Sequence, residues 1–293
     1  MKNPFVLVAV ALILVLGCRK NNSGENCFSN NGARSIVHDG LSREYVLYIP
    51  SSYDGSAAAP LMLNFHGFGG SAGQYMEDAD LRSLAESDTF ILAYPQGSCL
   101  NGSSHWNACP VGGDNKSSAD DFGFFEAMIN DISTEAMVDM ERIYAFGYSN
   151  GGMMAYGLAN YRSDLVAAVG SVSGTMLDCA GTISHPMPVV HLHGTSDGVL
   201  PYNGSNDYTS TQDVLDYWIT FNNTSTSPIV SAETNGGMTI EHYVYNQGDS
   251  AVSVEHYKYI GGDHVWFTNT FQGQNTGELI CNFMSRYDIN GLR

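Results

Sequence analysis

The chain has 293 residues, of which 43% are hydrophobic, enough to build the core of a single α/β domain. Its formal net charge of −18, with only 12 lysines and arginines, argues against nucleic acid or an anionic membrane surface as a partner.

The N-terminus has the pattern of an export signal. Lys2 precedes an apolar run over residues 5–16, which is shorter than the roughly 20 residues of a membrane-spanning helix. The run ends in L-V-L-G before Cys18, which resembles a bacterial lipobox and implies lipidation of that thiol; plain secretion is the alternative. We therefore expect a lipoprotein signal peptide over residues 1–17, a tether and entry segment over 18–40, and an exported protein. It would lie on the outer membrane or cell surface, held only by its lipid anchor, or be secreted.

Five further cysteines are available for disulfides in an exported protein: Cys27, Cys99, Cys109, Cys179 and Cys281. Two of them, Cys99 and Cys109, bracket one short loop, so we predict a bridge between them that contributes about 2–3 kcal/mol. The odd number leaves at least one thiol free, and the pairing of the other three stays open. The chain has no C-x-x-C pattern, so no structural zinc is expected.

Residues 41–293 are expected to form one α/β domain, a mostly parallel sheet with helices on both faces. The first strand, residues 43–49, alternates polar and apolar side chains and reads as an edge-like strand. Further strands are expected over residues 61–65, 90–94, 143–146, 166–172, 189–193, 239–245 and 252–259, and helices over 78–87, 120–132, 152–161, 211–221 and 276–285. Residues 96–118 read as a long loop. The alternation of strands with helices predicts this fold class.

A candidate nucleophile, Ser149, stands in the sequence G-Y-S-N-G over residues 147–151, between a predicted strand and a predicted helix. In a G-x-S-x-G turn, the serine takes an unfavourable backbone conformation that projects its hydroxyl out of the sheet. The helix N-terminus behind it suits a developing oxyanion.

Candidate partners follow in the order Ser, Asp, His that is typical of α/β-hydrolases. Asp197 follows the strand over residues 189–193, and His264 lies in a glycine-rich loop after a later strand. Asp263 and Asp207 are alternatives for the carboxylate.

A second histidine pattern lies on the strand before Asp197. His191 and His193 alternate and so point the same way, which would suit a metal pair, but no third ligand is evident. We expect neither a metal nor a cofactor. The turn H-G-F-G-G over residues 66–70 and the residue after the serine would supply two oxyanion N–H groups, those of Phe68 and Asn150.

Four segments, L-N-F-H-G-F-G-G-S, G-Y-S-N-G-G, H-L-H-G-T-S-D-G-V-L-P-Y and G-G-D-H-V-W, occur in order over residues 43–285. This set resembles the polyhydroxybutyrate depolymerase / feruloyl and acetyl xylan esterase group of α/β-hydrolases. The resemblance implies that residues 41–293 form an α/β-hydrolase catalytic domain. It also implies that Ser149 is the nucleophile, that Asp197 and His264 are its partners, and that the Phe68 amide lies in the oxyanion hole.

Aromatic residues near these segments are expected to line the substrate cleft. They are Trp106, Tyr148 and Trp266, with Tyr156 and Tyr202 as further candidates; the alternative for the two tryptophans is a core position.

The expected function is hydrolysis of feruloyl or acetyl esters of polysaccharides through a Ser-His-Asp acyl-enzyme mechanism. Depolymerisation of polyhydroxybutyrate or a related polyester is the second hypothesis. A peptidase is a rival, although the chain has no room for the added propeller or cap domain. A non-catalytic glycan-binding lipoprotein is the alternative from another class. The ester substrate is the expected partner, and the oligomeric state stays open.

Overall fold

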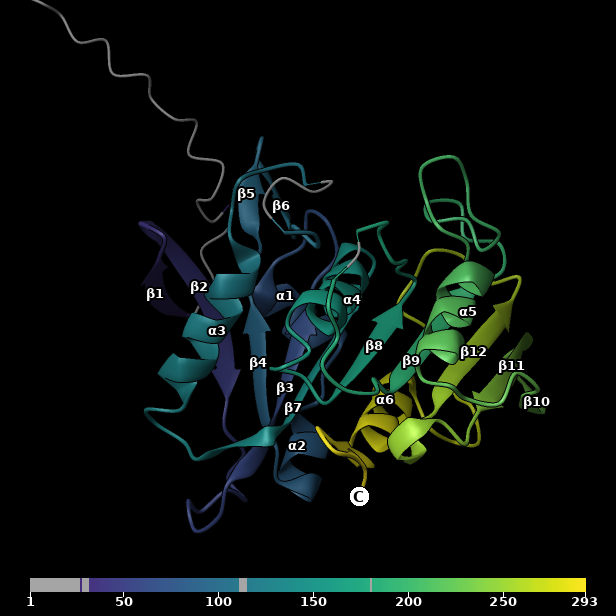
Figure 1. Cartoon of the computed structure of the whole chain (residues 1–293). Coiled ribbons are helices and arrows are strands. Elements are labelled where there is room, and N and C mark those ends of the chain that lie inside the picture. Colours follow the sequence, from purple (N-terminus) through teal and green to yellow (C-terminus); the bar gives the residue numbers. More distant parts are fainter. Residues whose placement is uncertain (1–26, 28–31, 111–114, 180) are drawn as a thin grey trace, which may run out of the picture.

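A ten-stranded sheet organises the chain (Figure 1). The computed structural model describes residues 27, 32–110, 115–179 and 181–293. The strand order is β1-β2-β4-β3-β7-β8-β9-β12-β11-β10. The strands are β1 Arg34–His38, β2 Leu41–Tyr48, β3 Ala59–Phe65, β4 Ile91–Pro95, β7 Val138–Tyr148, β8 Ala168–Val172, β9 Val189–Gly194, β10 Ile229–Asn235, β11 Met238–Tyr245 and β12 Val254–Ile260.

The centre of the sheet is parallel and its edges are antiparallel. Strands β4, β3, β7, β8, β9 and β12 run in one direction, whereas β2 and β11 run against their inner neighbours. Every residue of β8 and β9 is buried, as expected for strands covered on both faces. The carboxyl ends of the parallel strands therefore meet at one edge, where open α/β sheets place their sites.

Helices cover both faces of the sheet. They are α1 Ala72–Asp78, α2 Arg82–Asp88, α3 Asp121–Ile132, α4 Asn150–Tyr161, α5 Thr211–Phe221 and α6 Thr276–Met284. The buried side chains of α3, α4 and α5 form one core with one face, and those of α1, α2 and α6 form a second core with the other. The predicted fold class is confirmed.

Several predicted elements differ from the observed ones. The strand over residues 43–49 is not at the edge, because β1 pairs with it in antiparallel register. Strand β1 lies within residues 18–40, which we assigned to a tether and entry segment. The predicted helix over residues 78–87 is confirmed only in its second part, as α2; Asp78 ends α1, and Ala79 separates the two helices because its backbone angles are non-helical (φ −119°, ψ 58°). Strand β10 was not predicted. The first four of its seven residues are all exposed, so the strand lacks the alternation of buried and exposed side chains that marks a strand in a sequence.

The segment 96–118 is not a plain loop. It carries a small hairpin of β5 Ser98–Leu100 and β6 Ser103–His105. A second hairpin of β13 Tyr287–Asp288 and β14 Gly291–Leu292 closes the chain, and a 3₁₀ turn spans Asp249–Ala251.

Two disulfides connect distant segments, and the predicted Cys99–Cys109 bridge is wrong. Cys27 pairs with Cys99, and Cys109 pairs with Cys179, whereas Cys281 is a buried free thiol. After β6 the chain runs against α4, where the Ala108 carbonyl lies 2.5 Å from the position a Cβ would take on Gly157. This path carries Cys109 to the segment after β8, where Cys179 lies.

Within the described ranges, no helix has the length and apolar character needed to cross a membrane. The expected signal peptide and Cys18 lie outside the described residues.

Candidate active site

Ser149 stands on a sharp turn between β7 and α4. Its backbone angles are φ 56° and ψ −120°, a strained conformation for a residue with a side chain, and its N–H donates to the Val172 carbonyl at 2.9 Å. A Cβ on Gly151 would stand 2.1 Å from the Phe65 oxygen, and one on Gly147 would stand 2.5 Å from the Gly151 carbonyl carbon. Only glycine at these two positions lets strand and helix close around the serine.

His264 reaches Ser149 from the loop after β12. Its Nε2 lies 2.9 Å from Ser149 Oγ. The loop is held by two bonds: the Tyr148 hydroxyl donates to the His264 carbonyl at 2.9 Å, and the His264 N–H donates to Asp263 Oδ1 at 2.8 Å. Asp263 was one alternative to Asp197 as the partner of the histidine, and its side chain stabilises the loop in which it lies.

Asp197 completes the chain of hydrogen bonds. Its Oδ2 accepts from His264 Nδ1 at 2.8 Å, and its Oδ1 accepts the N–H groups of Val199 and Leu200, both at 2.8 Å. Burial alone would raise the pKa of Asp197, but hydrogen bonds from His193, His264 and the two backbone N–H groups outweigh it and hold the pKa well below its usual range. The carboxylate is therefore ionised at neutral pH. Asp207, the other alternative, is exposed.

Two backbone N–H groups belong to residues that line the same cavity as Ser149. Asn150 is the first residue of α4, so its N–H belongs to the first turn, where helices leave donors without an intrahelical acceptor. Phe68 lies in the turn after β3; its side chain is 55% exposed, and the Lys116 ammonium stands 5.6 Å from the ring centroid. Phe68, Asn150 and Ser149 line one cavity. This arrangement suits an oxyanion formed at the serine.

His66 braces the turn that carries Phe68. Its Nδ1 bonds the Gly67 carbonyl at 2.7 Å, and its Nε2 accepts the Gly97 N–H at 3.0 Å, which fixes the tautomer. Burial lowers the pKa of His66 to about 4, so the ring is neutral at physiological pH.

The cavity at Ser149, the serine cavity, has a volume of about 350 Å³. Its apolar lining includes Met153, Leu177, Leu200 and Tyr208. Trp106 lines it too but is only 3% exposed, and its Nε1–H donates to the His66 carbonyl at 2.8 Å. Trp106 thus combines the two expected roles, a wall of the cleft and a core aromatic.

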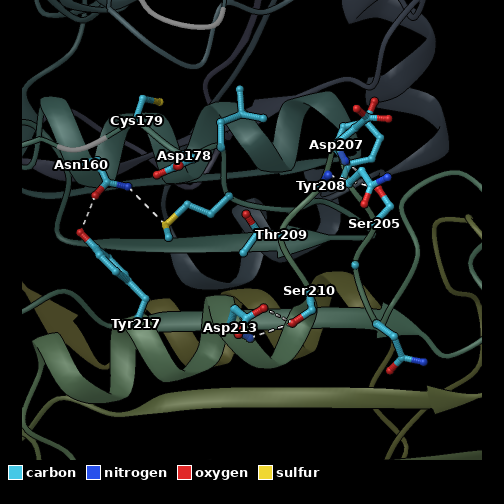
Figure 2. A pocket seen from close by; sticks show the side chains of 15 residues that line it. Asn160, Asp178, Cys179, Ser205, Asp207, Tyr208, Thr209, Ser210, Asp213 and Tyr217 are labelled. Atoms are coloured by element: carbon cyan, nitrogen blue, oxygen red, sulfur yellow. Dashed lines mark hydrogen bonds between the residues drawn. The ribbon is translucent and has the colours of Figure 1, made fainter.

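A second, polar cavity of about 590 Å³ adjoins the serine cavity, and Leu177, Asp207 and Tyr208 line both. Figure 2 shows its polar side chains, with Tyr217 bonded to Asn160 and Ser210 bonded to Asp213. It combines carboxylate, amide and hydroxyl groups with two tyrosine rings, and the described residues that line it include no lysine or arginine.

Four aromatic residues expected in the cleft do not line the serine cavity, although the Tyr148 ring lies against His264 with centroids 5.2 Å apart. Trp266 packs edge-on against Tyr75 of α1, with ring centroids 5.9 Å apart, and borders a different hollow. Tyr148 is outside the serine cavity and supports the His264 loop through its hydroxyl. Tyr156 is buried against His191, and the Tyr202 hydroxyl bonds His256. All four residues are close in sequence to a predicted site residue, but the strand end that carries Tyr148, the helix that carries Tyr156 and the loops that carry Tyr202 and Trp266 direct the side chains away from the cavity.

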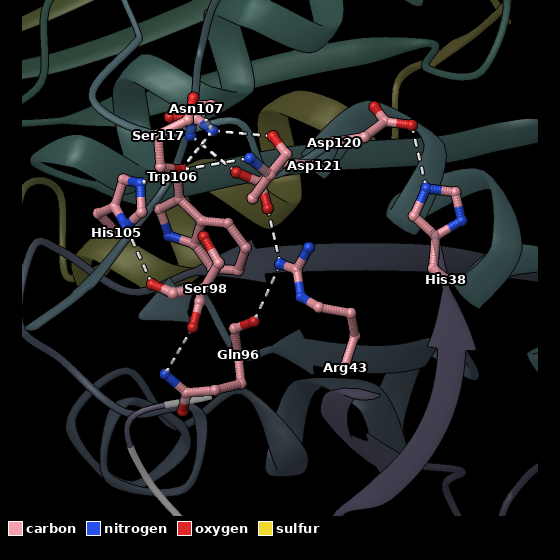
Figure 3. Close-up of polar contacts among 12 residues, drawn as sticks. His38, Arg43, Gln96, Ser98, His105, Trp106, Asn107, Ser117, Asp120 and Asp121 are labelled. Atoms are coloured by element: carbon pink, nitrogen blue, oxygen red, sulfur yellow. Dashed lines mark hydrogen bonds and ion pairs between the residues drawn. The ribbon is translucent and has the colours of Figure 1, made fainter. Parts of the chain in front are cut away.

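A buried ion pair that the sequence did not reveal supports the Trp106 loop (Figure 3). Arg43 Nη2 lies 2.6 Å from Asp121 Oδ1, and Asp121 Oδ2 accepts the Asn107 N–H at 2.8 Å. The Trp106 N–H in turn donates to Asn150 Oδ1 at 2.7 Å, which connects the pair to the residue after the serine. The only sequence feature that marks Arg43 is its charge within a strand.

Within the described residues, no group of three His, Cys, Asp or Glu side chains could hold a metal ion.

Comparison with known proteins agrees with the geometry. A family model described as Esterase PHB depolymerase matches residues 43–233. Feruloyl esterase B of Piromyces equi is 33% identical over 171 residues, which cover 55% of this chain and 30% of that protein. Probable feruloyl esterase C of Aspergillus clavatus is 30% identical over 175 residues, which cover 59% of this chain and 60% of that protein. The chain thus spans less than two thirds of the length of these relatives.

Among solved structures, an acetyl xylan esterase from Aspergillus awamori matches with a TM-score of 0.64 at 15% identity, over 86% of this chain and 98% of that one. At this identity the likeness shows the fold, that of α/β-hydrolases. Since the family model covers well over half of the sequence, the chain belongs to the Esterase PHB depolymerase family of α/β-hydrolase esterases.

Proposed function

We propose that the protein hydrolyses carboxylic esters through an acyl-enzyme formed on Ser149. The observation that carries the proposal is the continuous chain of hydrogen bonds from Ser149 Oγ through His264 to Asp197, with distances of 2.9 and 2.8 Å. Membership in an esterase family supports it.

The reaction follows from the positions of the three groups. Ser149 Oγ attacks the ester carbonyl carbon while His264 Nε2 takes its proton, and Asp197 keeps the imidazole in the required tautomer. His264 then returns the proton to the leaving alcohol. A water molecule, activated by the same nitrogen, releases the acid and restores the serine.

The oxyanion of the tetrahedral intermediate accepts hydrogen bonds from the N–H groups of Phe68 and Asn150. Their positions at a turn and at a helix N-terminus favour negative charge there. Loss of one such donor typically raises the barrier by about 2.7–4 kcal/mol.

The substrate class that the two cavities favour is an acyl ester of a carbohydrate. The serine cavity, with its apolar lining, suits an acetyl or hydroxycinnamoyl group. The adjoining polar cavity offers hydroxyl, amide and carboxylate groups to a sugar. The next units of a polyester such as polyhydroxybutyrate would instead place apolar groups against these polar atoms. The names of the relatives, feruloyl esterases among them, agree with this choice.

The test compares the full-length protein with Ser149→Ala and with Ser163→Ala, a matched control that removes a buried serine just beyond the other end of α4. Substrates are p-nitrophenyl acetate, methyl ferulate, acetylated xylan, dispersed polyhydroxybutyrate and a peptide panel. We expect wild type and Ser163→Ala to cleave the first three, and Ser149→Ala to be folded and inactive. Activity of Ser149→Ala near the wild-type level would refute Ser149 as the nucleophile. Preference for the polyester or for peptides would change the substrate class, and glycan binding without turnover would favour a binding protein.

Export as a lipoprotein is a second part of the proposal. Two disulfides agree with an oxidising compartment. If Cys18 is the lipidated residue, the wild-type protein incorporates radiolabelled palmitate in a bacterial host and Cys18→Ser does not; equal labelling of both would contradict the assignment.

A further inference from the structure

A buried chain of side chains continues from Asp197 into the core. His193 Nε2 lies 3.2 Å from Asp197 Oδ2 and 2.9 Å from the Leu200 carbonyl oxygen. His193 Nδ1 lies 3.1 Å from His191 Nε2, and His191 Nδ1 lies 2.7 Å from the Tyr156 hydroxyl. The two histidines and Tyr156 are at most 1% exposed.

The Leu200 carbonyl at one end sets the direction of the bonds in this chain when each imidazole carries a single hydrogen. A carbonyl oxygen only accepts, so His193 Nε2 carries the hydrogen that faces Leu200 and Asp197. His193 Nδ1 is then an acceptor for His191 Nε2–H, and His191 Nδ1 accepts from the Tyr156 hydroxyl. Burial lowers the pKa of His191 well below its ordinary value and raises that of Tyr156, so both stay neutral.

The surroundings add no charge in direct contact with the chain. His256 lies beside His191, donates from Nδ1 to its carbonyl at 3.0 Å and accepts the Tyr202 hydroxyl at 2.9 Å. Burial lowers the pKa of His256 to about 3, so it too is neutral. Other titratable groups of the described residues near this chain include His264, bonded to Asp197, and Asp263, whose Oδ1 accepts the N–H groups of Gly198 and His264. Lys258 lies further out, with its ammonium 6.0 Å from the Tyr202 ring centroid.

We propose that His193 is a positioning residue for the esterase reaction, acting through Asp197. It places Nε2, whose single hydrogen bonds the Leu200 carbonyl, 3.2 Å from Oδ2, the same carboxylate oxygen that binds His264, while the N–H groups of Val199 and Leu200 hold Oδ1. The carboxylate is thereby fixed in direction at both oxygens, which keeps the imidazole aimed at Ser149. This role rests on the proposed function.

His191 and His193, which alternate on β9, therefore belong to a hydrogen-bonded chain and are not arranged as a pair of metal ligands. The two rings stack with centroids 5.2 Å apart, and the nitrogens that face each other are a donor and an acceptor. Their lone pairs do not converge on one point.

The test uses two variants that differ by one methylene group. In His193→Gln the side-chain amide nitrogen reaches about the place of Nε2 and keeps the donor to Asp197. In His193→Asn it stands near Nδ1 and is too short to reach Asp197. As a matched control, His185→Gln changes a histidine that bonds backbone carbonyl groups away from the triad.

Hydrolysis of p-nitrophenyl acetate by the full-length proteins is measured from pH 5 to 9. We expect His193→Asn to lose about 100-fold in kcat with little change in KM, since misplacement of a catalytic group by about 1 Å has an effect of this size. Its acidic limb moves to higher pH, because a carboxylate that has lost a donor holds the protonated form of His264 more strongly, and that form cannot accept the proton of Ser149. His193→Gln should recover most of kcat and the wild-type profile, and His185→Gln should match wild type.

Equal losses in His193→Asn and His193→Gln with an unchanged pH profile would overturn the proposal, as would wild-type kcat in His193→Asn. A readout independent of turnover is the downfield proton NMR resonance of the N–H that His264 shares with Asp197. We expect it in wild type and His193→Gln and expect it shifted or lost in His193→Asn; the same resonance in all three would contradict the role. A wild type inactive on every ester would refute the proposed function, and the resonance would still decide the role of His193.

Discussion

The ion pair between Arg43 and Asp121 gives the sharpest prediction on stability. The two side chains are 1% and 0% exposed, and Nη2 and Oδ1 stand 2.6 Å apart. Removing one partner leaves the other charge buried, which typically destabilises a protein by about 3–5 kcal/mol. We therefore expect Arg43→Met and Asp121→Asn each to lower the free energy of unfolding by that amount. Methionine keeps an unbranched side chain over the Phe124 ring, which lies 4.0 Å from the guanidinium carbon.

The double variant separates lost charge from lost packing. In Arg43→Met/Asp121→Asn neither charge of the pair remains at this site, and the asparagine oxygen still accepts the Asn107 N–H that Asp121 Oδ2 accepts at 2.8 Å. We expect it to lie within about 2 kcal/mol of wild type, as is common when a whole buried pair is replaced. The two single losses therefore do not add.

The assay is urea unfolding of the four proteins at pH 7, followed by tryptophan fluorescence. Single losses below about 1 kcal/mol, or a double loss equal to the sum of the single ones, would refute the reasoning.

Three further predictions concern close packing, a disulfide and pH. Gly151→Ala should abolish ester hydrolysis and lower the melting temperature, because the new methyl group would stand 2.1 Å from the Phe65 oxygen; wild-type kcat would contradict this. Cys109→Ser/Cys179→Ser should lower the free energy of unfolding by about 4 kcal/mol, since the bridge joins residues 70 apart, and denaturant curves that coincide with wild type would disprove it. Burial lowers the pKa of His66 from 6.5 to about 4 in the folded protein. As the pH falls, the unfolded chain therefore takes up this proton at a higher pH than the folded protein does. Stability should fall by about 3 kcal/mol from this residue as pH drops from 6.5 to 4, and urea curves at pH 7 and 5 with equal midpoints would exclude it.

The triad geometry could be predicted because its determinants are local. The serine turn needs glycines at fixed offsets, and the chain shows them on both sides of Ser149. Asp197 and His264 each follow a strand of the parallel part of the sheet, and such strands end at one edge. Sequence order therefore implied proximity, and the structure places the three side chains in hydrogen-bond contact.

The disulfides and the direction of the aromatic side chains could not be predicted, because both depend on how loops cross. Cys99 and Cys109 are near in sequence, but the β5–β6 hairpin and the path along α4 separate them. Trp266 follows His264 by two residues, yet the loop turns its ring onto α1. Sequence proximity to a catalytic residue says little about where a neighbouring side chain points.

The two histidines of β9 show that a sequence pattern can predict the orientation of side chains correctly and still leave their role open. Alternation on a strand puts His191 and His193 on one face, as expected, and either a metal or a hydrogen-bonded chain could use that face. The groups at the ends decide between them: Tyr156 supplies a hydroxyl donor at one end, and Asp197 supplies a carboxylate acceptor at the other. Neither lies on β9, so the strand's own sequence does not contain the answer. Because this chain joins the proposed catalytic carboxylate to the core under α4, changes in core packing there should reach the triad through His193.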